Sequence, residues 1–77
     1  MQEQEATQVV IRKEPIRLSQ FLKLANVVQD GLEAKIRIIE GEVQVNGSLE
    51  TRRGRKLVHG DIVEMDNAAF QVCSGGS

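Results

Sequence analysis

The sequence predicts an α+β fold in which two helices pack against one side of a small, mostly antiparallel sheet. Two observations lead to this class. Two segments with apolar residues at helical spacing come first, and an alternating run then leads into Asn46-Gly47, a pair typical of two-residue hairpin turns. A chain of 77 residues has room for one such domain with a small core, whose stability we expect to be only a few kcal/mol.

We expect a single domain over residues 8–73. It is preceded by a polar, unpatterned segment, residues 1–7, which we expect to be disordered, and followed by a flexible tail of Ser and Gly, residues 74–77. The longest uninterrupted apolar runs have three residues, which is too short to cross a membrane, and the polar start of the chain does not resemble a signal peptide. We therefore expect a cytoplasmic protein without a membrane partner.

The first strand is expected at residues 9–11. It ends before Pro15, whose ring fixes its own φ and disfavours helix at the preceding residue. An amphipathic helix of about three turns should follow, because apolar residues recur at helical spacing from Leu18 to Val28. Lys23 falls on its polar face, and its apolar face must dock on the core.

A second helix is expected over residues 31–40. Asp30 and Glu33 have the spacing of a capping box, with Asp in place of Ser, and Gly41 provides a C-terminal stop. Its apolar residues form two stripes. One contains Leu32, Ile36 and Ile39, and the other contains Ala34 and Ile38. We therefore expect this helix to be sandwiched between the first helix and the sheet.

The two cations of the second helix should behave differently. Lys35 and Arg37 are about 160° apart on a helical wheel, so they cannot both line one flat binding patch. Arg37 shares an edge with Glu33 and Glu40, where we expect solvated ion pairs.

Two further strands are expected over residues 62–65 and 69–72, joined by the turn-favouring pair Asp66-Asn67. Before them lies a loop opened by Gly54 that carries four cations. They are Arg52, Arg53, Arg55 and Lys56. Guanidinium groups in such a loop can pair with phosphate oxygens, so the loop is a candidate nucleic-acid site. The alternative is a solvated charged turn.

The net charge of −1 is unevenly distributed along the chain. Residues 12–56 contain all ten basic residues and six acidic ones, giving +4, whereas the rest of the chain carries −5. Local field, rather than whole-chain charge, governs the encounter with a polyanion. The distribution is compatible with a cationic face, and an ordinary mixed-charge surface is the alternative.

Several motifs occur in a fixed order through the middle of the chain. They are Arg17-Leu18, Leu22, Ala34-x-x-x-Ile38, Gly41-x-Val43-x-Val45-Asn46-Gly47, the basic run, and Val58-x-Gly60-Asp61-x-Val63. Over about residues 16–65 this order resembles the RNA-binding domain named after small-subunit ribosomal protein S-four (the S4 domain, or alpha-L motif), and especially the small free-standing bacterial proteins of the YbcJ type. The resemblance implies non-catalytic binding of structured RNA, by analogy ribosomal RNA, in a module associated with ribosomes or their assembly.

In this family the helices and the adjacent loop form the binding surface. Arg17 matches the arginine at the start of the family's first helix. The family carries Ser-Arg at the start of its second helix, whereas this chain has Asp30-Gly31, so one usual phosphate ligand is replaced and Lys35 is the candidate substitute. The RNA-binding residues that we predict are Arg17, Lys23, Lys35, Arg52, Arg53, Arg55 and Lys56.

The aromatic residues favour structured RNA over single strands. The only two, Phe21 and Phe70, fall in apolar patterns typical of a core, so no exposed ring is expected on which bases could stack. Folded or double-helical RNA is instead held by phosphate and 2′-hydroxyl contacts and recognised by its shape.

Catalytic and metal-binding patterns are lacking in the sequence. The only histidine, His59, precedes a Gly-Asp turn and has no recognisable nucleophile motif beside it, and the only cysteine, Cys73, has no companion for a disulfide or a zinc site. We expect no catalytic residue, metal, cofactor or small-molecule substrate, and we expect a monomer.

Two other functional classes stay open at this level. A protein-interaction module would use an acidic or an apolar surface. A ubiquitin-like sulfur carrier would end in a free Gly-Gly carboxylate, but here Ser77 follows Gly76, and the helices precede the hairpin instead of following it.

Overall fold

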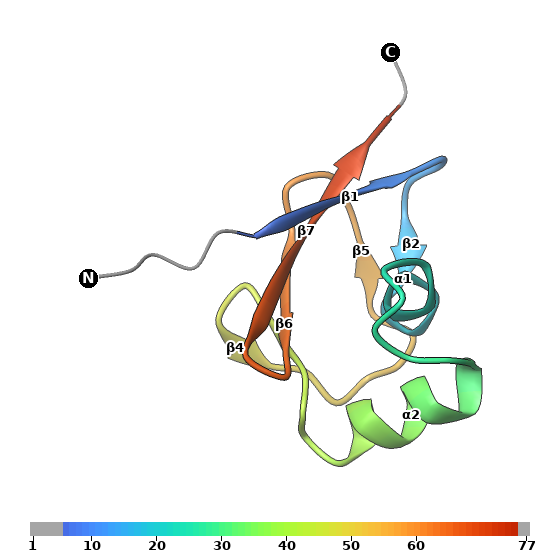
Figure 1. Cartoon of the computed structure of the whole chain (residues 1–77), viewed down its shortest axis with the longest axis vertical. Helices are drawn as coiled ribbons and strands as arrows, with labels where there is room; N and C mark the ends of the chain where they lie inside the picture. Colours follow the sequence, from blue (N-terminus) through green and yellow to red (C-terminus); the bar gives the residue numbers. More distant parts are fainter. Residues whose placement is uncertain (1–5, 76–77) are drawn as a thin grey trace.

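The fold spans residues 6–75, the part of the chain that the computed structural model describes (Figure 1). Strand β1 begins at Thr7 and strand β7 ends at Ser74, each one residue outside the predicted domain bounds of 8–73. The predicted disordered start and flexible tail fall mainly on residues 1–5 and 76–77, which lie outside the described residues.

Within residues 6–75 the strands form a five-stranded sheet and a separate two-stranded sheet. The larger sheet has the order β1 (Thr7–Ile11), β7 (Ala68–Ser74), β6 (Ile62–Met65), β3 (Gln44–Val45) and β4 (Ser48–Leu49). Its β1–β7 pair is parallel and its other pairs are antiparallel, which confirms the predicted mostly antiparallel sheet. The smaller sheet pairs β2 (Ile16–Arg17) with β5 (Lys56–Leu57), strands too short to leave an alternating sequence pattern.

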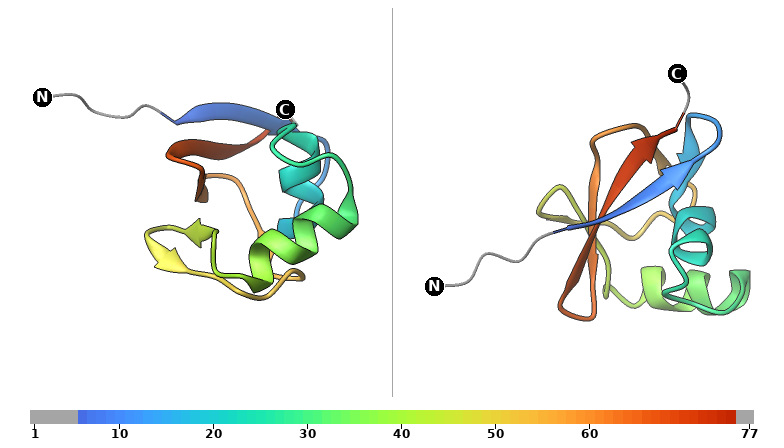
Figure 2. Two further views of the ribbon diagram at one scale, coloured as in Figure 1. Left: turned by 60° about the horizontal axis from the view of Figure 1, so that its bottom comes forward. Right: turned by 45° about the horizontal axis from the view of Figure 1, so that its top comes forward.

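The core lies between the curved larger sheet and the helices α1 (Leu18–Leu24) and α2 (Gly31–Ile39), as Figure 2 shows. This arrangement confirms the predicted fold class. Both helices, the strands β1, β6 and β7, the small sheet and the residue before β3 contribute fully buried side chains. The largest are Phe21, Ile11, Leu18, Leu22, Ile38, Leu57, Val43, Val63 and Val72. The basic loop is therefore attached to the core at its end through Leu57.

The predicted hairpin at Asn46-Gly47 is confirmed. Asn46 has φ 52° and Gly47 has φ 84°, the two positive values that a type I′ turn requires, and the flanking residues pair in the register Val45 with Ser48. The Asn46 side chain also ties the turn to the neighbouring loop, since its amide donates to Asp61 Oδ1 at 3.1 Å and its Oδ1 accepts from the Ile62 N–H at 2.9 Å. Sequence and tertiary contacts thus agree on this turn.

Replacing Gly47 with Val should lower the free energy of unfolding by about 1–3 kcal/mol, because a β-branched side chain strongly disfavours positive φ. A Cβ at residue 47 would meet no atom within 4 Å, so the cost comes from the backbone alone. The matched control is Gly54→Val, where the space is also open but φ is not positive. Thermal melting checks both variants, and an equal loss of stability in the two would contradict the positive-φ explanation.

Helix α1 is shorter than predicted. It ends at Leu24, so its seven residues make about two turns instead of three. Asn26 stops it by adopting a left-handed conformation with φ 62°. The Asn26 N–H donates to the Lys23 carbonyl at 2.9 Å and the Val27 N–H donates to the Leu22 carbonyl at 3.0 Å, the pair of bonds of a Schellman motif. Asparagine is the second choice after glycine for such a stop.

Helix α2 begins at Gly31 as predicted and ends at Ile39, one residue before the predicted limit. The Asp30 carboxylate accepts the Glu33 N–H at 2.9 Å, and Glu33 Oε1 accepts the Gln29 N–H at 2.7 Å, one residue earlier than in a standard capping box. Gly41, with φ 83°, ends the helix, and its N–H donates to the Ile38 carbonyl at 3.1 Å. Asp30 is therefore occupied as a helix cap.

The prediction that α2 is sandwiched between α1 and the sheet is wrong. Only the stripe with Ala34 and Ile38 is buried. The second stripe faces solvent, with exposed fractions of 66% at Leu32, 49% at Ile36 and 56% at Ile39. Helix α2 packs chiefly on α1, so one apolar side of it stays uncovered.

Candidate nucleic-acid interface

Two cations face each other across the small sheet. Arg17 in β2 is the register partner of Lys56 in β5, and both side chains are exposed. Like charges directly opposite on antiparallel strands repel and destabilise the pairing. Neither residue forms an ion pair with any of the described residues, so no carboxylate within residues 6–75 relieves this repulsion. A bound phosphate between the two strands would do so.

The basic loop is fixed beside Arg17 by the backbone at the start of α1. The Leu18 N–H donates to the Arg55 carbonyl at 2.8 Å, and the Ser19 N–H donates to the Arg53 carbonyl at 3.1 Å. These bonds hold the loop next to β2 and α1, where Figure 1 shows β5 alongside both. The structure thus brings Arg17, Arg53 and Lys56 together, and we call these three residues the Arg17 cluster.

Two of the four loop cations are paired with the same carboxylate, which offsets only one of their two positive charges. Arg52 binds Glu50 through Nε at 2.8 Å and Nη2 at 3.2 Å, and Arg55 Nε lies 3.4 Å from Glu50 Oε1. The Glu50 side chain is only 11% exposed, so this carboxylate sits at the edge of the core. The Arg52 hydrogen bond lowers the pKa of Glu50, and the same bond raises the pKa of Arg52. Glu50 thus pairs with Arg52 and Arg55, and Arg53 and Lys56 are the two loop cations without an ion pair among the described residues.

Replacing Glu50 with Gln should lower the free energy of unfolding at neutral pH by about 1–3 kcal/mol, because the charge-assisted hydrogen bonds from Arg52 and the ion pair with Arg55 are lost. A lowered carboxylate pKa adds stability above the unfolded-state pKa, and this contribution disappears as the pH falls through the folded-state value. The difference between wild type and Glu50→Gln should therefore shrink as the pH is lowered from about 5 to 3. Urea unfolding at several pH values measures the free energy of unfolding of both proteins. A stability difference that does not change with pH would contradict the role of the Glu50 charge.

The remaining predicted site residues lie on the helices. Lys23 on α1 and Lys35 on α2 are exposed and form no ion pair with the described residues. Two more unpaired cations, Arg12 and Lys13, lie in the connection between β1 and β2, where no family motif points to them. Counted over residues 6–75, seven of the ten cations in the chain are unpaired, and only Arg37, Arg52 and Arg55 bind carboxylates.

Arg37 belongs to a different surface. It forms ion pairs with Glu33 at 3.7 Å, with Asp66 at 2.6 Å and with Glu42. The predicted pairing with Glu33 is confirmed, whereas the predicted partner Glu40 is replaced by Glu42 and Asp66. Hydrogen bonds to Asp66 and then to Glu42 raise the pKa of Arg37. Arg37 is thus held on the opposite flank of α2 from Lys35, as the helical wheel predicts.

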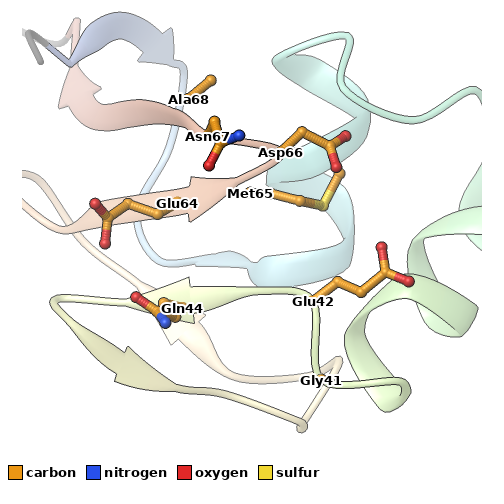
Figure 3. Close-up of a pocket in the computed structure, with 8 residues that line it drawn as sticks. All are labelled: Gly41, Glu42, Gln44, Glu64, Met65, Asp66, Asn67 and Ala68. Atoms are coloured by element: carbon orange, nitrogen blue, oxygen red, sulfur yellow. The ribbon is translucent and has the colours of Figure 1, made fainter.

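The surface next to Arg37 is acidic. A pocket of about 280 Å³ is lined there by Glu42, Glu64 and Asp66, among others. Figure 3 shows Glu42 and Asp66 on the side of the pocket nearest α2 and Glu64 at its other end. A polyanion would be repelled from these carboxylates, so this side of the molecule does not suit nucleic acid.

The single histidine and cysteine occupy structural positions. His59 Nδ1 accepts the Ser74 N–H at 2.9 Å, and the His59 N–H donates to Glu14 Oε1 at 3.1 Å, so this residue joins two loops to the end of β7. Cys73 is half-buried in β7. Among residues 6–75 there is no group of three or more His, Cys, Asp or Glu side chains that could hold a metal ion, and no helix there is long and apolar enough to span a membrane.

Comparison with known proteins agrees with this geometry. The S4 domain family model matches residues 9–73. The chain belongs to the S4 domain family. This family of non-catalytic RNA-binding domains is the one that the ordered motifs predict, and membership in it removes the sulfur-carrier alternative.

Individual relatives of this S4 domain are similar over most of their length. The chain is 50% identical over 68 residues to a probable ribosome maturation protein, RlbA of Bacillus subtilis (strain 168), covering 87% of this chain and 96% of RlbA. It is 40% identical over 57 residues to YbcJ of Escherichia coli (strain K12), covering 74% and 81% of the two chains. The solution structure of E. coli YbcJ, described as revealing an alpha-L motif involved in RNA binding, superposes with a TM-score of 0.68 at 34% identity and covers 95% of this chain and 94% of YbcJ.

Proposed function

We propose that this S4 domain binds structured ribosomal RNA during ribosome maturation, and that the Arg17 cluster is the centre of its binding surface. The observation that carries the proposal is the like-charged Arg17–Lys56 pair, which has no carboxylate partner among the described residues. Such a pair costs stability in the free protein and is stabilised when a phosphate neutralises it. Lys35 and Lys23 extend the surface onto the helices.

The chemistry of this surface favours the RNA backbone over the bases. Phe21 is completely buried and Phe70 packs against the core, so neither ring is presented for stacking. Arginine and lysine side chains remain, and these contact phosphates, which position a protein on RNA without reading its sequence. Recognition by the shape of a folded RNA follows from this set of contacts.

The departure from the family's Ser-Arg motif has a structural reason. Asp30 caps α2 by accepting the Glu33 N–H, so this position stabilises the helix instead of contacting a phosphate. Gly31 has no side chain to replace the family's arginine. Lys35 stands one turn further along the same helix, exposed and unpaired among the described residues, and it takes over this contact in our proposal.

The relative with the highest identity reported above supports the process that we propose. RlbA, which matches this chain over nearly its whole length, is named as a probable ribosome maturation protein. A role in this process would place the protein in the cytoplasm, where bacterial ribosomes are assembled. The proposal for this chain is therefore a small accessory protein that binds ribosomal RNA as ribosomal particles form.

The salt dependence of binding to a structured RNA hairpin tests the proposed surface. If about five phosphates are neutralised, log K should fall against log salt concentration with a slope near −4. Arg53→Gln should flatten this slope by about 0.8, since it removes one contact. The matched control is Arg37→Gln, which removes the same charge from the acidic side and should leave the slope unchanged. Equal flattening by both variants would show that overall charge drives binding.

Sedimentation tests the proposed process and the one competing class. The exposed stripe of Leu32, Ile36 and Ile39 on α2 is the observation that favours a protein-interaction module. An RNA-bound protein should sediment with ribosomal particles and leave them when nuclease digests the RNA. A module held by protein contacts should stay with the pelleted proteins after the same treatment, and this result would overturn the proposed function.

A further inference from the structure

A second cationic surface adjoins the Arg17 cluster. An open groove of about 720 Å³ lies between the β1–β2 connection and α1, and we call it the α1 groove. Three cations line it, namely Arg12 and Lys13 from the connection and Lys23 from the helix. None of the three forms an ion pair with a described residue, and no carboxylate is among the residues that line the groove.

The nearest acidic residue in the sequence is turned away from this groove. Glu14 follows Lys13 directly but does not line the groove, because its Oε1 atom accepts the His59 N–H at 3.1 Å. The positive charge of Arg12 and Lys13 is therefore not offset by their neighbour. Holding Glu14 at His59 keeps the groove cationic.

The floor of the groove is apolar. Val10 and Leu24 line it with exposed fractions of 63% and 51%, so both side chains are open to contact with a ligand. Cations around an apolar floor match the sugar–phosphate backbone of a nucleic acid, in which charged phosphates alternate with less polar sugars. The groove thus offers cations to the phosphates and apolar side chains to the sugars.

The groove is continuous with the proposed RNA site. Ile16, which lines the groove, directly precedes Arg17. Gln20 also lines the groove, and its Oε1 accepts the Arg17 N–H at 3.4 Å. A chain bound at the Arg17 cluster can therefore pass into the groove without crossing the acidic surface beside Arg37. This continuity favours an RNA strand over a separate acidic peptide.

We propose that the α1 groove binds the backbone of a single RNA strand that extends from the structured RNA held at the Arg17 cluster. This inference rests on the proposed function and adds a second element to the ligand, a helix with a single-stranded extension. Arg12 and Lys13 contact the phosphates of the extension, beside Lys23 of the surface that binds the structured RNA, and Val10 and Leu24 contact the sugars of the extension.

Two RNAs test this proposal, a blunt hairpin and the same hairpin with a single-stranded uridine extension. With two further phosphate contacts, from Arg12 and Lys13, the extension should raise the affinity of the wild-type protein by more than tenfold at about 0.1 M salt and steepen the salt slope by about 1.4. The variant Arg12→Gln/Lys13→Gln should lose most of this gain and bind the blunt hairpin like wild type. Both residues are exposed, so the melting temperature should not change.

The matched control is Arg17→Gln/Arg53→Gln, which removes the same charge from the Arg17 cluster. It should weaken binding of both RNAs by the same factor and keep the gain from the extension. The proposal is overturned if wild type gains nothing from the extension, or if the gain survives in Arg12→Gln/Lys13→Gln. It is also overturned if a glutamate-rich peptide binds the groove of the wild-type protein more tightly than the extension does.

The same measurements separate this proposal from the proposed function. Hairpin binding that depends on Arg17 and Arg53, without any gain from the extension, would reject only the groove. Failure of the wild-type protein to bind either RNA would reject the proposed function, and the groove proposal with it.

Discussion

Replacing Arg17 with Glu is expected to weaken binding of structured RNA by about a hundredfold at 0.1 M salt and to raise the melting temperature. Loss of one phosphate contact costs about tenfold at this salt concentration, and repulsion between the new carboxylate and the RNA backbone should cost about as much again. The new carboxylate would at the same time face Lys56 across the β2–β5 pair. An opposite-charge pair in this position contributes about 0.2–1 kcal/mol, so the melting temperature should rise by about 1–8 °C.

The double variant Arg17→Glu/Lys56→Glu provides the internal check. It restores like charges across the strand pair, so its stability should return to the wild-type value while RNA binding is weakened further. Anisotropy titrations and thermal melting measure the two effects. The explanation of Arg17 as a functional cation fails if Arg17→Glu lowers stability and binding together, because that pattern is typical of a residue needed for folding.

Replacing Leu22 with Ala is expected to unfold most of the protein at room temperature. Leu22 is completely buried, and the loss of a buried leucine side chain costs about 2.7–5 kcal/mol, which is comparable with the whole stability expected for a core of this size. Leu24→Ala is the matched control, since the same substitution is made two residues away on the same helix, where the side chain is 51% exposed. It should change stability by less than about 0.5 kcal/mol.

Circular dichroism and urea unfolding compare the two leucine variants. A cooperative transition in Leu24→Ala and none in Leu22→Ala is the expected result. Similar unfolding curves for the two would contradict the placement of Leu22 in the core and of Leu24 at the surface.

The fold was predictable from the sequence where a local rule dictates the backbone. Asn46-Gly47 forms the type I′ turn because its two residues tolerate positive φ. Helix α2 starts where expected and ends within one residue of the expected limit, because Asp30 caps its N-terminus and Gly41 stops its C-terminus. The second strand pair, β6 and β7, turns at Asp66-Asn67, where both φ values are again positive. Each of these features is decided by the residues at the turn or at the helix end itself.

The two errors in the helices have different causes, one a local stop signal and the other the tertiary arrangement. Asn26 ended α1 early, although apolar residues continue at helical spacing beyond it. The stripe of Leu32, Ile36 and Ile39 was expected to be covered because it is apolar, but neither α1 nor the sheet extends over it. Whether an apolar stripe is covered depends on the tertiary arrangement, which periodicity does not describe.

The candidate site also combines features that the sequence reveals with features that only the tertiary structure reveals. The basic residues were evident from composition, but the distinction between unpaired and ion-paired cations required the position of Glu50, which accepts a hydrogen bond from Arg52 and pairs with Arg55. The opposition of Arg17 and Lys56 also follows from pairing between segments about forty residues apart, which no local pattern predicts. The sequence therefore identifies the charged residues of a binding surface, whereas only the tertiary structure shows which of them pair with carboxylates.

Titration of the isotopically labelled protein with a structured RNA hairpin, followed by amide NMR shifts, shows directly whether RNA contacts the Arg17 cluster and avoids the acidic surface beside Arg37. We predict that the largest shifts occur at residues 17–20 and 53–56, with smaller shifts around Lys35, and that the amides of Glu42, Glu64 and Asp66 stay in place. Shifts concentrated at those three acidic residues, or spread evenly over the chain, would contradict the account.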